Sequence, residues 1–189
     1  MEEKIAKLQE IKEKCEKCQG CPLHATRTNL VFGRGNVNAD ILFVGEAPGE
    51  KEDLSGEPFV GAAGKLLDKF LVAVGLTEND YYIANIIKCR PPKNRDPKPE
   101  EEDACIDFLR EQVSVIKPKM IVCLGRISAK RIIKPDFKIT EEHGVWFKRG
   151  ETLLTAVFHP AAVLRDPRRK ADMLSDFEKI AEIKNEIKK

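Results

Sequence analysis

Four short apolar runs constrain the fold of this 189-residue chain more than any other feature. Each is the length of a buried strand and ends in polar or glycine-containing residues, and they occupy residues 40–45, 81–87, 120–124 and 153–158. Segments with helical spacing of apolar residues flank them, at about residues 1–17, 62–75, 99–116, 127–133 and 171–187. This alternation predicts a three-layer α/β/α sandwich around a four-stranded parallel sheet.

The remaining segments predict loops and one extra strand. We expect a single domain over residues 1–189, because this length suits one core. Residues 27–33 could form a short edge strand, and residues 137–150 read as an irregular hairpin. Residues 90–97 cannot join the sheet ladder, because Pro91, Pro92 and Pro97 interrupt it.

In a parallel α/β sheet, ligands bind beyond the carboxyl ends of the strands. That rule gathers four loops at one edge, at residues 45–59, 85–95, 125–127 and 159–170. The first loop contains the acidic stretch Gly45–Asp53, whose glycines allow close approach of a ligand. Two polar residues, Asn85 and His159, end strands at the same edge.

Charge is nearly balanced, with 33 Lys and Arg against 31 Asp and Glu. Two stretches are locally basic, residues 88–98 (including Lys88) and residues 165–170. Both fit contacts with a polyanion, although a solvated surface is the alternative for each. The high charge with few Met and aromatic residues weakly suggests a thermophile. No apolar run is long enough for a membrane span or a signal peptide, so we expect a cytoplasmic protein.

Six cysteines in such a chain favour metal binding over disulfides. Cys15, Cys18 and Cys21 have C-x2-C-x2-C spacing, and Cys89 and Cys105 lie far along the chain. The last two could complete a four-thiolate site with two of the first three, but spacing alone selects no pair. Physical reasoning also leaves zinc and an iron–sulfur cluster open. Cys123 lies within an apolar strand and reads as a core thiol.

Four motifs together with these cysteines resemble the family 4 uracil-DNA glycosylases, the thermostable iron–sulfur branch of that superfamily. The motifs are Gly45–Asp53, Gly56–Gly61, Asn85–Arg95 and His159–Arg165, and the resemblance covers roughly residues 15–170. It implies a [4Fe-4S] cluster held by Cys18, Cys21, Cys89 and Cys105, with Cys15 as an extra thiol. It also implies hydrolytic release of uracil from single- or double-stranded DNA in base excision repair, by a protein that we expect to be monomeric.

The resemblance places a uracil pocket at the sheet edge, with the base flipped out of the DNA stack. Phe59 would stack on the base, Asn85 would pair with O4 and N3–H, and His159 would donate a hydrogen bond to O2. Backbone groups of Gly45, Ala47 and Gly49 would line the pocket. Each of the three side chains has a purely structural alternative: Phe59 as a core residue, Asn85 as a turn residue at a strand end, and His159 as a core histidine.

The position of Ala47 holds an aspartate in the best-known branch of the superfamily, where it positions the attacking water. Glu46, Glu52 and Asn94 are the candidates for that role here, and the resemblance favours Asn94 and Glu52, with Glu46 shaping the pocket. Residues that would contact DNA are Arg90, Lys93, Arg95, Val163, Leu164, Arg165 and Arg168. The segment Val163–Arg165 resembles an intercalation loop, in which an apolar side chain fills the gap left by the base.

Two rival functions follow from the same residues. The absent carboxylate at Ala47 suggests a non-catalytic iron–sulfur protein that binds DNA or senses damage. The cysteines alone would also suit a zinc-stabilised enzyme that processes nucleotides.

Overall fold

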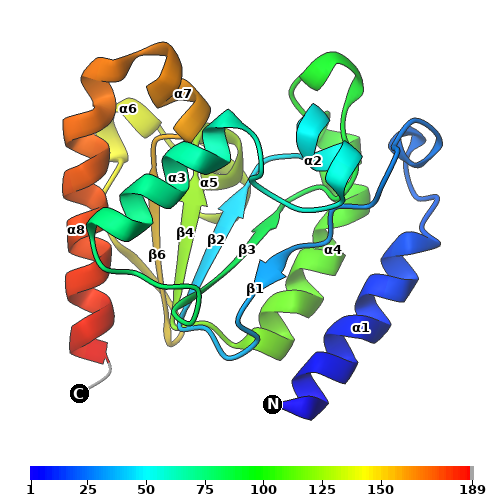
Figure 1. Ribbon diagram of the computed structural model, residues 1–189, viewed down its shortest axis with the longest axis horizontal. Coiled ribbons are helices and arrows are strands. Elements are labelled where there is room, and N and C mark those ends of the chain that lie inside the picture. The colour runs from blue at the N-terminus through cyan, green and yellow to red at the C-terminus, as the bar shows by residue number, and fades with distance from the viewer. Residues whose placement is uncertain (188–189) are drawn as a thin grey trace.

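The structure is a computed structural model that describes residues 1–187, and its centre is a six-stranded sheet with the order β1-β3-β2-β4-β6-β5 (Figure 1). The strands are β1 (Arg34–Gly35), β2 (Ile41–Gly45), β3 (Tyr81–Asn85), β4 (Met120–Leu124), β5 (Phe147–Arg149) and β6 (Thr152–Val157). The four central strands, β3, β2, β4 and β6, are parallel, as the sequence predicts. The two edge strands, β1 and β5, run antiparallel to their neighbours.

The edge strands correct the sequence-based expectation of a four-stranded sheet. The expected edge strand at residues 27–33 does not form. Only the two residues that follow it, Arg34 and Gly35, pair with β3 at this edge. The region 137–150 contains a short helix followed by β5, which pairs with β6. Both strands are too short to show period-2 alternation, which is why the sequence does not reveal them.

Eight α-helices lie among the described residues. They are α1 (Glu2–Glu16), α2 (Glu50–Ser55), α3 (Ala62–Ala73), α4 (Pro99–Ile116), α5 (Arg126–Ile132), α6 (Ile139–Glu142), α7 (Pro160–Arg165) and α8 (Lys170–Ile187). Three single 3-10 turns accompany them, at Pro22–Ala25, Pro92–Asn94 and Pro167–Arg169. Within this part of the chain, no helix is both long and apolar enough to cross a membrane.

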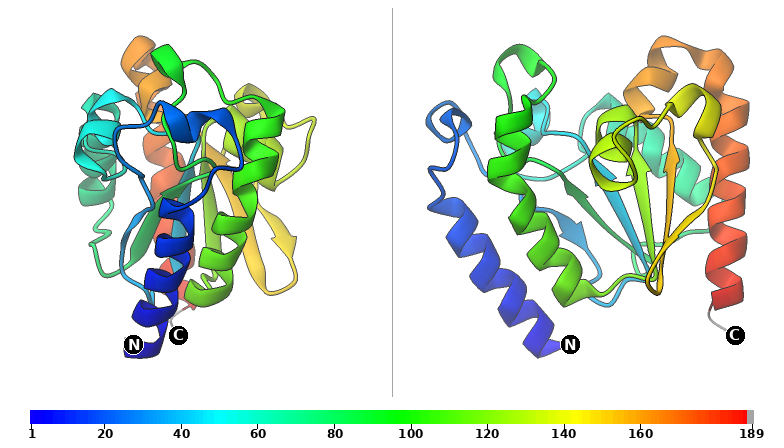
Figure 2. Two further views of the ribbon diagram at one scale, coloured as in Figure 1. Left: turned by 90° about the vertical axis from the view of Figure 1, so that its right-hand side faces the viewer. Right: turned by 180° about the vertical axis from the view of Figure 1, so that it is seen from behind.

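Two apolar cores cover the two faces of the sheet. Alternate residues of β2 separate between them: Leu42 and Val44 face α1, α4 and α5, whereas Ile41 and Phe43 face α3 and α8. The views in Figure 2 show α1 beside α4 on one face and α3 with α8 on the other. Each central strand is buried on both faces, which explains its uninterrupted apolar sequence.

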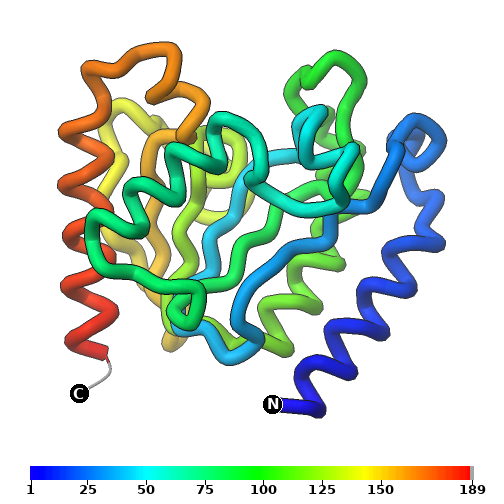
Figure 3. The backbone as a smooth tube through the Cα atoms, viewed as in Figure 1, coloured from blue at the N-terminus to red at the C-terminus, as the bar shows by residue number. Residues whose placement is uncertain are grey.

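Both ends of the described chain lie below the sheet in Figure 3, opposite the edge where the parallel strands end. At that upper edge the loops expected at 45–59 and 159–170 contain the short helices α2 and α7. Helix α2 lacks an apolar face, since Asp53 is its one buried residue, so periodicity does not predict it. Helix α7 begins at Pro160, a residue suited to the first helical turn, and His159 caps it.

Candidate active site

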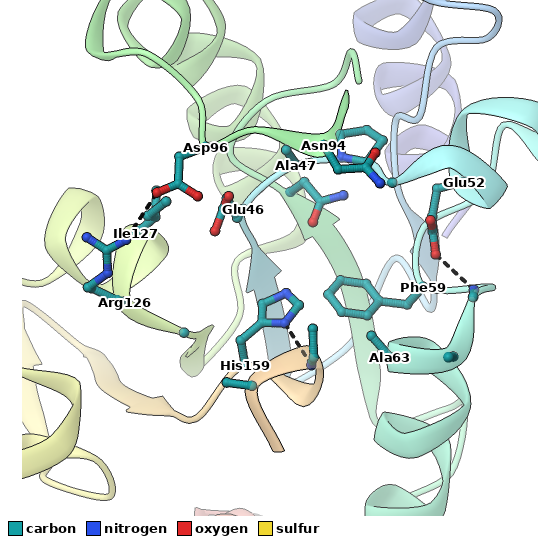
Figure 4. Close-up of a pocket in the computed structure, with 18 of the residues that line it drawn as sticks. Glu46, Ala47, Glu52, Phe59, Ala63, Asn94, Asp96, Arg126, Ile127 and His159 are labelled. Atoms are coloured by element: carbon teal, nitrogen blue, oxygen red, sulfur yellow. Dashed lines mark hydrogen bonds and ion pairs between the residues drawn. The ribbon is translucent and has the colours of Figure 1, made fainter. Parts of the chain in front are cut away.

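A cavity of about 630 Å³ opens at the carboxyl ends of the parallel strands. Its walls come from residues 46–52, 59–63, 91–96, 125–127 and 158–169, with Asn85 at the end of β3. Figure 4 shows Glu46, Ala47, Glu52, Phe59, Asn94 and His159 arranged around this hollow. The structure thus brings together the residues that the sequence assigns to base binding and hydrolysis.

Asn85 presents an unpaired amide oxygen at this site. The residue is 2% exposed, and its Oδ1 has no hydrogen-bond partner anywhere in residues 1–187. A buried polar atom without a partner is destabilising, so it indicates a ligand that donates a hydrogen bond. Gly45 makes room for this amide, because a Cβ atom at residue 45 would lie 2.3 Å from Asn85 Oδ1.

Phe59 is held in a backbone conformation that phenylalanine rarely adopts, with φ at 55°. Its carbonyl packs against α3 where Gly64 has no side chain, since a Cβ there would lie 1.8 Å from Phe59 O. The ring lies 5.9 Å from the His159 imidazole, centroid to centroid. Backbone strain of this kind is maintained where the surroundings require it, often at ligand sites.

His159 is a neutral hydrogen-bond donor in this arrangement. Its Nδ1 accepts a hydrogen bond from the backbone N–H of Ala161 at 3.0 Å, so the ring proton of the neutral form resides on Nε2. Burial, reinforced by the positive charge of Arg165, lowers the pKa of His159 to about 4. Gly125 permits the close approach of this residue, because a Cβ there would lie 2.8 Å from His159 Cβ.

The three candidate water-positioning residues have different surroundings. Glu52 Oε1 accepts hydrogen bonds from the backbone N–H groups of Val60 (3.0 Å) and Gly61 (2.9 Å), which fixes the carboxylate at the start of α3. Asn94 Oδ1 accepts a hydrogen bond from Arg90 Nε at 2.8 Å, which leaves the Asn94 amide N–H groups to donate. The Glu46 carboxyl has its pKa raised to about 7, by burial first and then by nearby Asp96.

The cavity also contains residues that the sequence does not single out. Asp96 and Arg126 form an ion pair of 3.1 Å between the proline-rich loop and the start of α5. Ile127 also lines the cavity there, whereas Arg169, another lining residue, belongs to the second basic stretch that the sequence does indicate. The sheet-edge rule gathers their loops, but no motif marks these side chains individually.

Five of the six cysteines line a second, smaller cavity between the end of α1 and α4. They are Cys15, Cys18, Cys21, Cys89 and Cys105, whereas Cys123 is buried in β4. The buried Cys15 therefore accompanies the four thiols that the resemblance assigns to a cluster. Within residues 1–187, no group of three or more His, Cys, Asp or Glu side chains is arranged to hold a metal ion.

N–H groups point at the sulfur atoms of this second cavity. The backbone N–H of Gly20 donates to Cys18 Sγ at 3.3 Å, and Arg27 Nη1 donates to Cys89 Sγ at 3.2 Å. Such donors stabilise thiolates bound to iron. The chemistry of these residues therefore fits an iron–sulfur cluster, which is held by four thiolates and tuned by hydrogen bonds to its sulfur atoms.

Comparison with known proteins assigns the family. A family model described as the Uracil DNA glycosylase superfamily matches residues 32–182. A type-4 uracil-DNA glycosylase from Archaeoglobus fulgidus is 48% identical, over 93% of this chain and 92% of that protein. The chain belongs to the type-4 uracil-DNA glycosylases. Proteins of the same name from Sulfurisphaera tokodaii and Thermotoga maritima are 45% and 41% identical, over 93% and 91% of this chain and 84% and 92% of theirs.

The first basic stretch of this type-4 glycosylase is only partly available to DNA. Lys88 is completely buried, which corrects the expectation that it contacts a polyanion. Arg95 forms a two-pronged ion pair with buried Glu101, at 2.7 and 2.9 Å. Lys93 is exposed, and Arg90 is bound to Asn94 at the cavity rim.

The segment Val163–Arg165 and the second basic stretch divide in the same way. Val163 is fully buried in the core beside α3 and α8, which corrects the expectation that this side chain enters DNA. Leu164 is 46% exposed and is the apolar side chain that α7 presents to solvent. Arg165 lines the cavity, and Arg168 is exposed and paired with Asp166 at 2.8 Å.

Proposed function

We propose that this protein is a monofunctional uracil-DNA glycosylase, which hydrolyses the N-glycosidic bond of deoxyuridine and leaves an abasic site. The single observation that carries the proposal is the unpaired Asn85 Oδ1 in a cavity that also contains His159. The Asn85 amide accepts from uracil N3–H and donates to O4, a pair of groups that cytosine presents in the opposite sense. Cytosine would leave buried polar groups unpaired and is therefore rejected.

The flipped base stacks on Phe59, and its O2 faces the imidazole. Breaking the C1′–N1 bond places negative charge on the uracil, mainly on O2, and positive charge on the sugar. The neutral His159 donates from Nε2 to that oxygen, because Nδ1 is occupied by the N–H of Ala161. A fixed donor at a site of developing charge is commonly the largest single contribution to catalysis.

Water activation relies on neighbours of Ala47 instead of a carboxylate at that position. Both Asn94 and Glu52 line the cavity, and each has one oxygen engaged by the protein. We propose that the remaining Asn94 amide N–H groups and the second Glu52 oxygen hold the attacking water. The partly protonated Glu46 shapes the pocket beside them.

We propose that Cys18, Cys21, Cys89 and Cys105 hold a [4Fe-4S] cluster. Hydrolysis requires no electron transfer, so the cluster would act as a structural link between the end of α1, the end of β3 and α4. The residues that we propose to contact DNA are Arg90, Lys93, Leu164, Arg165 and Arg168. Arg95 instead stabilises the loop through its ion pair with Glu101. The protein would act as a cytoplasmic monomer on single- or double-stranded DNA and release uracil.

The test measures free uracil and abasic sites after incubation with single- and double-stranded DNA that contains one deoxyuridine. Wild type should release uracil, and Asn85→Ala, His159→Ala and Asn94→Ala should each be strongly impaired. Cys123→Ala, a buried change in β4 outside both cavities, serves as the control. No release by wild type from either substrate would refute the proposal. Tight binding without release would instead support a non-catalytic damage sensor, which the alanine at position 47 favours.

A further inference from the structure

Lys88 is the one completely buried lysine in residues 1–187, and all its N–H groups are engaged. Its Nζ donates to the backbone oxygen of Phe32 at 3.2 Å, the side-chain Oε1 of Gln112 at 2.6 Å and the backbone oxygen of Asn85 at 2.9 Å. Three donors thus meet three acceptors inside the core. Buried ammonium groups are rare because desolvation is unfavourable, so a complete set of partners indicates a specific role.

Two of these three acceptors, on Gln112 and Phe32, are also joined to each other by a hydrogen bond. Gln112 is fully buried on α4, and its Nε2 donates to the same Phe32 oxygen at 3.0 Å. The Lys88 ammonium also lies 5.7 Å from the centre of the Phe32 ring. The side chain of Lys88 is therefore fixed by groups that lie outside the uracil cavity.

The third acceptor is the carbonyl of the residue that reads the base. After β3 ends at Asn85, the chain turns while Ile86 N bonds to Gly45 O (3.0 Å) and Ile87 N to Glu46 O (3.2 Å). The bond from Lys88 Nζ holds the Asn85 carbonyl on the other side of this turn. Because the amide of Asn85 extends from the same residue, the orientation of that peptide sets where Oδ1 points.

The same residue adjoins the cysteine cavity. Lys88 lines it, Cys89 follows directly in sequence, and Cys105 lies two turns before Gln112 on α4. The Lys88 side chain thereby connects the cysteine cavity to the backbone carbonyl of Asn85. No other side chain among the described residues lines the cysteine cavity and also bonds to Asn85.

We propose that Lys88 is a positioning residue for base recognition, which fixes Asn85 relative to Gln112 on α4 and to the Phe32 carbonyl. The inference rests on the proposed function, since it gives Asn85 the task of reading uracil. It also links the cysteine cavity to recognition, because Lys88 lines that cavity and bonds to the backbone of Asn85.

The test compares Lys88→Met with Lys4→Met. Methionine keeps an unbranched side chain of nearly the same length and removes the N–H donors. Lys4 is a matched control, because its Nζ also donates to backbone oxygens, those of Ile116 (2.9 Å) and Val37 (3.4 Å), at the far end of α4. The measurements are kcat/KM for uracil release, iron content, thermal midpoint and amide exchange of residues 85–87.

Lys88→Met should lose about 100-fold in kcat/KM far below its thermal midpoint, as expected when a reacting group is displaced by about 1 Å. It should retain its iron and show faster exchange at residues 85–87, whereas Lys4→Met should lower the thermal midpoint and leave kcat/KM within threefold of wild type. If Lys88→Met does not fold, Lys88→Gln, whose side chain is one atom shorter and still donates N–H, should show the same loss.

Activity within threefold of wild type together with unchanged exchange at residues 85–87 would overturn the inference. Equal losses in Lys88→Met and Lys4→Met would also overturn it, because a general loss of stability would then suffice. Failure of wild type to release uracil would refute the proposed function separately. In that case amide exchange at residues 85–87 still decides whether Lys88 positions Asn85.

Discussion

Replacing Gly45 by alanine should strongly impair base recognition while leaving the fold intact. Gly45 is the last residue of β2, so an alanine backbone is compatible with its strand conformation. The added Cβ would lie 2.3 Å from Asn85 Oδ1 and 2.7 Å from the Phe59 ring, closer than atoms can approach. Both side chains border the cavity and can move into it, so the overpacking should destabilise the protein by only about 1–3 kcal/mol.

The loss of catalysis should be larger than the loss of stability. Two misaligned hydrogen bonds at about 1 kcal/mol each and a stacking contact of about 1–3 kcal/mol amount to about 3–5 kcal/mol. At about 1.4 kcal/mol per factor of ten, kcat/KM should fall by about 100- to 4,000-fold. Single-turnover cleavage of a deoxyuridine oligonucleotide measures this directly.

Gly64→Ala provides the contrast for this prediction. Its Cβ would meet the backbone oxygen of Phe59 at 1.8 Å, and a backbone atom inside the packed turn cannot yield as a side chain can. That variant should lose both stability and activity. A Gly45→Ala protein that keeps its activity within threefold would refute the assignment of Asn85 and Phe59 as the base-binding walls.

Three further predictions concern titration, metal and DNA contact. In a Glu46→Gln background, which removes the carboxyl with a pKa of about 7, kcat/KM should stay level from pH 8 to pH 5 and fall only near the His159 pKa of about 4. Because that pKa lies below the ordinary value of 6.5, the stability that the neutral imidazole contributes is complete above pH 6.5 and is lost as pH falls through 4. A value of kcat/KM that already halves near pH 6.5 would contradict the prediction that His159 stays neutral down to about pH 4. Serine at Cys18, Cys21, Cys89 or Cys105 should remove iron and visible absorbance, whereas Cys15→Ser should keep both, as iron and sulfide analysis will show; zinc in place of iron would refute the cluster. Leu164→Ala should weaken uracil excision from double-stranded DNA about tenfold more than from single strands, since a wedge matters only in a duplex. An equal effect of Leu164→Ala on both substrates would exclude the wedge. By contrast, Val163→Ala should lower the free energy of unfolding by about 2 kcal/mol.

Several parts of this structure could be predicted from the sequence because their signals are local. The four apolar runs and the helical periods fix the central sheet and its two covering layers. The strand-end positions of Asn85 and His159 place both at one edge, where they line one cavity. Five of the six cysteines likewise line a common cavity, as their number and spacing suggest.

The remaining features depend on contacts between distant residues. The sequence predicts Lys88 in a basic stretch and Val163 in an intercalation loop, both as DNA-facing residues, yet tertiary packing buries both completely. Nothing in the local sequence of Lys88 indicates that Gln112 and the Phe32 carbonyl supply its acceptors. Similarly, the roles of Gly45 and Gly64 emerge only once Asn85 and Phe59 occupy the space that a Cβ would fill.

The most direct test of the central claim compares deoxyuridine with N3-methyldeoxyuridine in the same oligonucleotide. Wild type should prefer deoxyuridine by at least about 1,000-fold, because the methyl group removes the N3–H that Asn85 Oδ1 requires. In Asn85→Ala the absolute rates should fall and the preference should shrink to within about tenfold, since the discriminating oxygen is then gone. Comparable excision of both nucleotides by wild type would contradict the account, because the unpaired oxygen at the end of β3 would then play no part in reading the base.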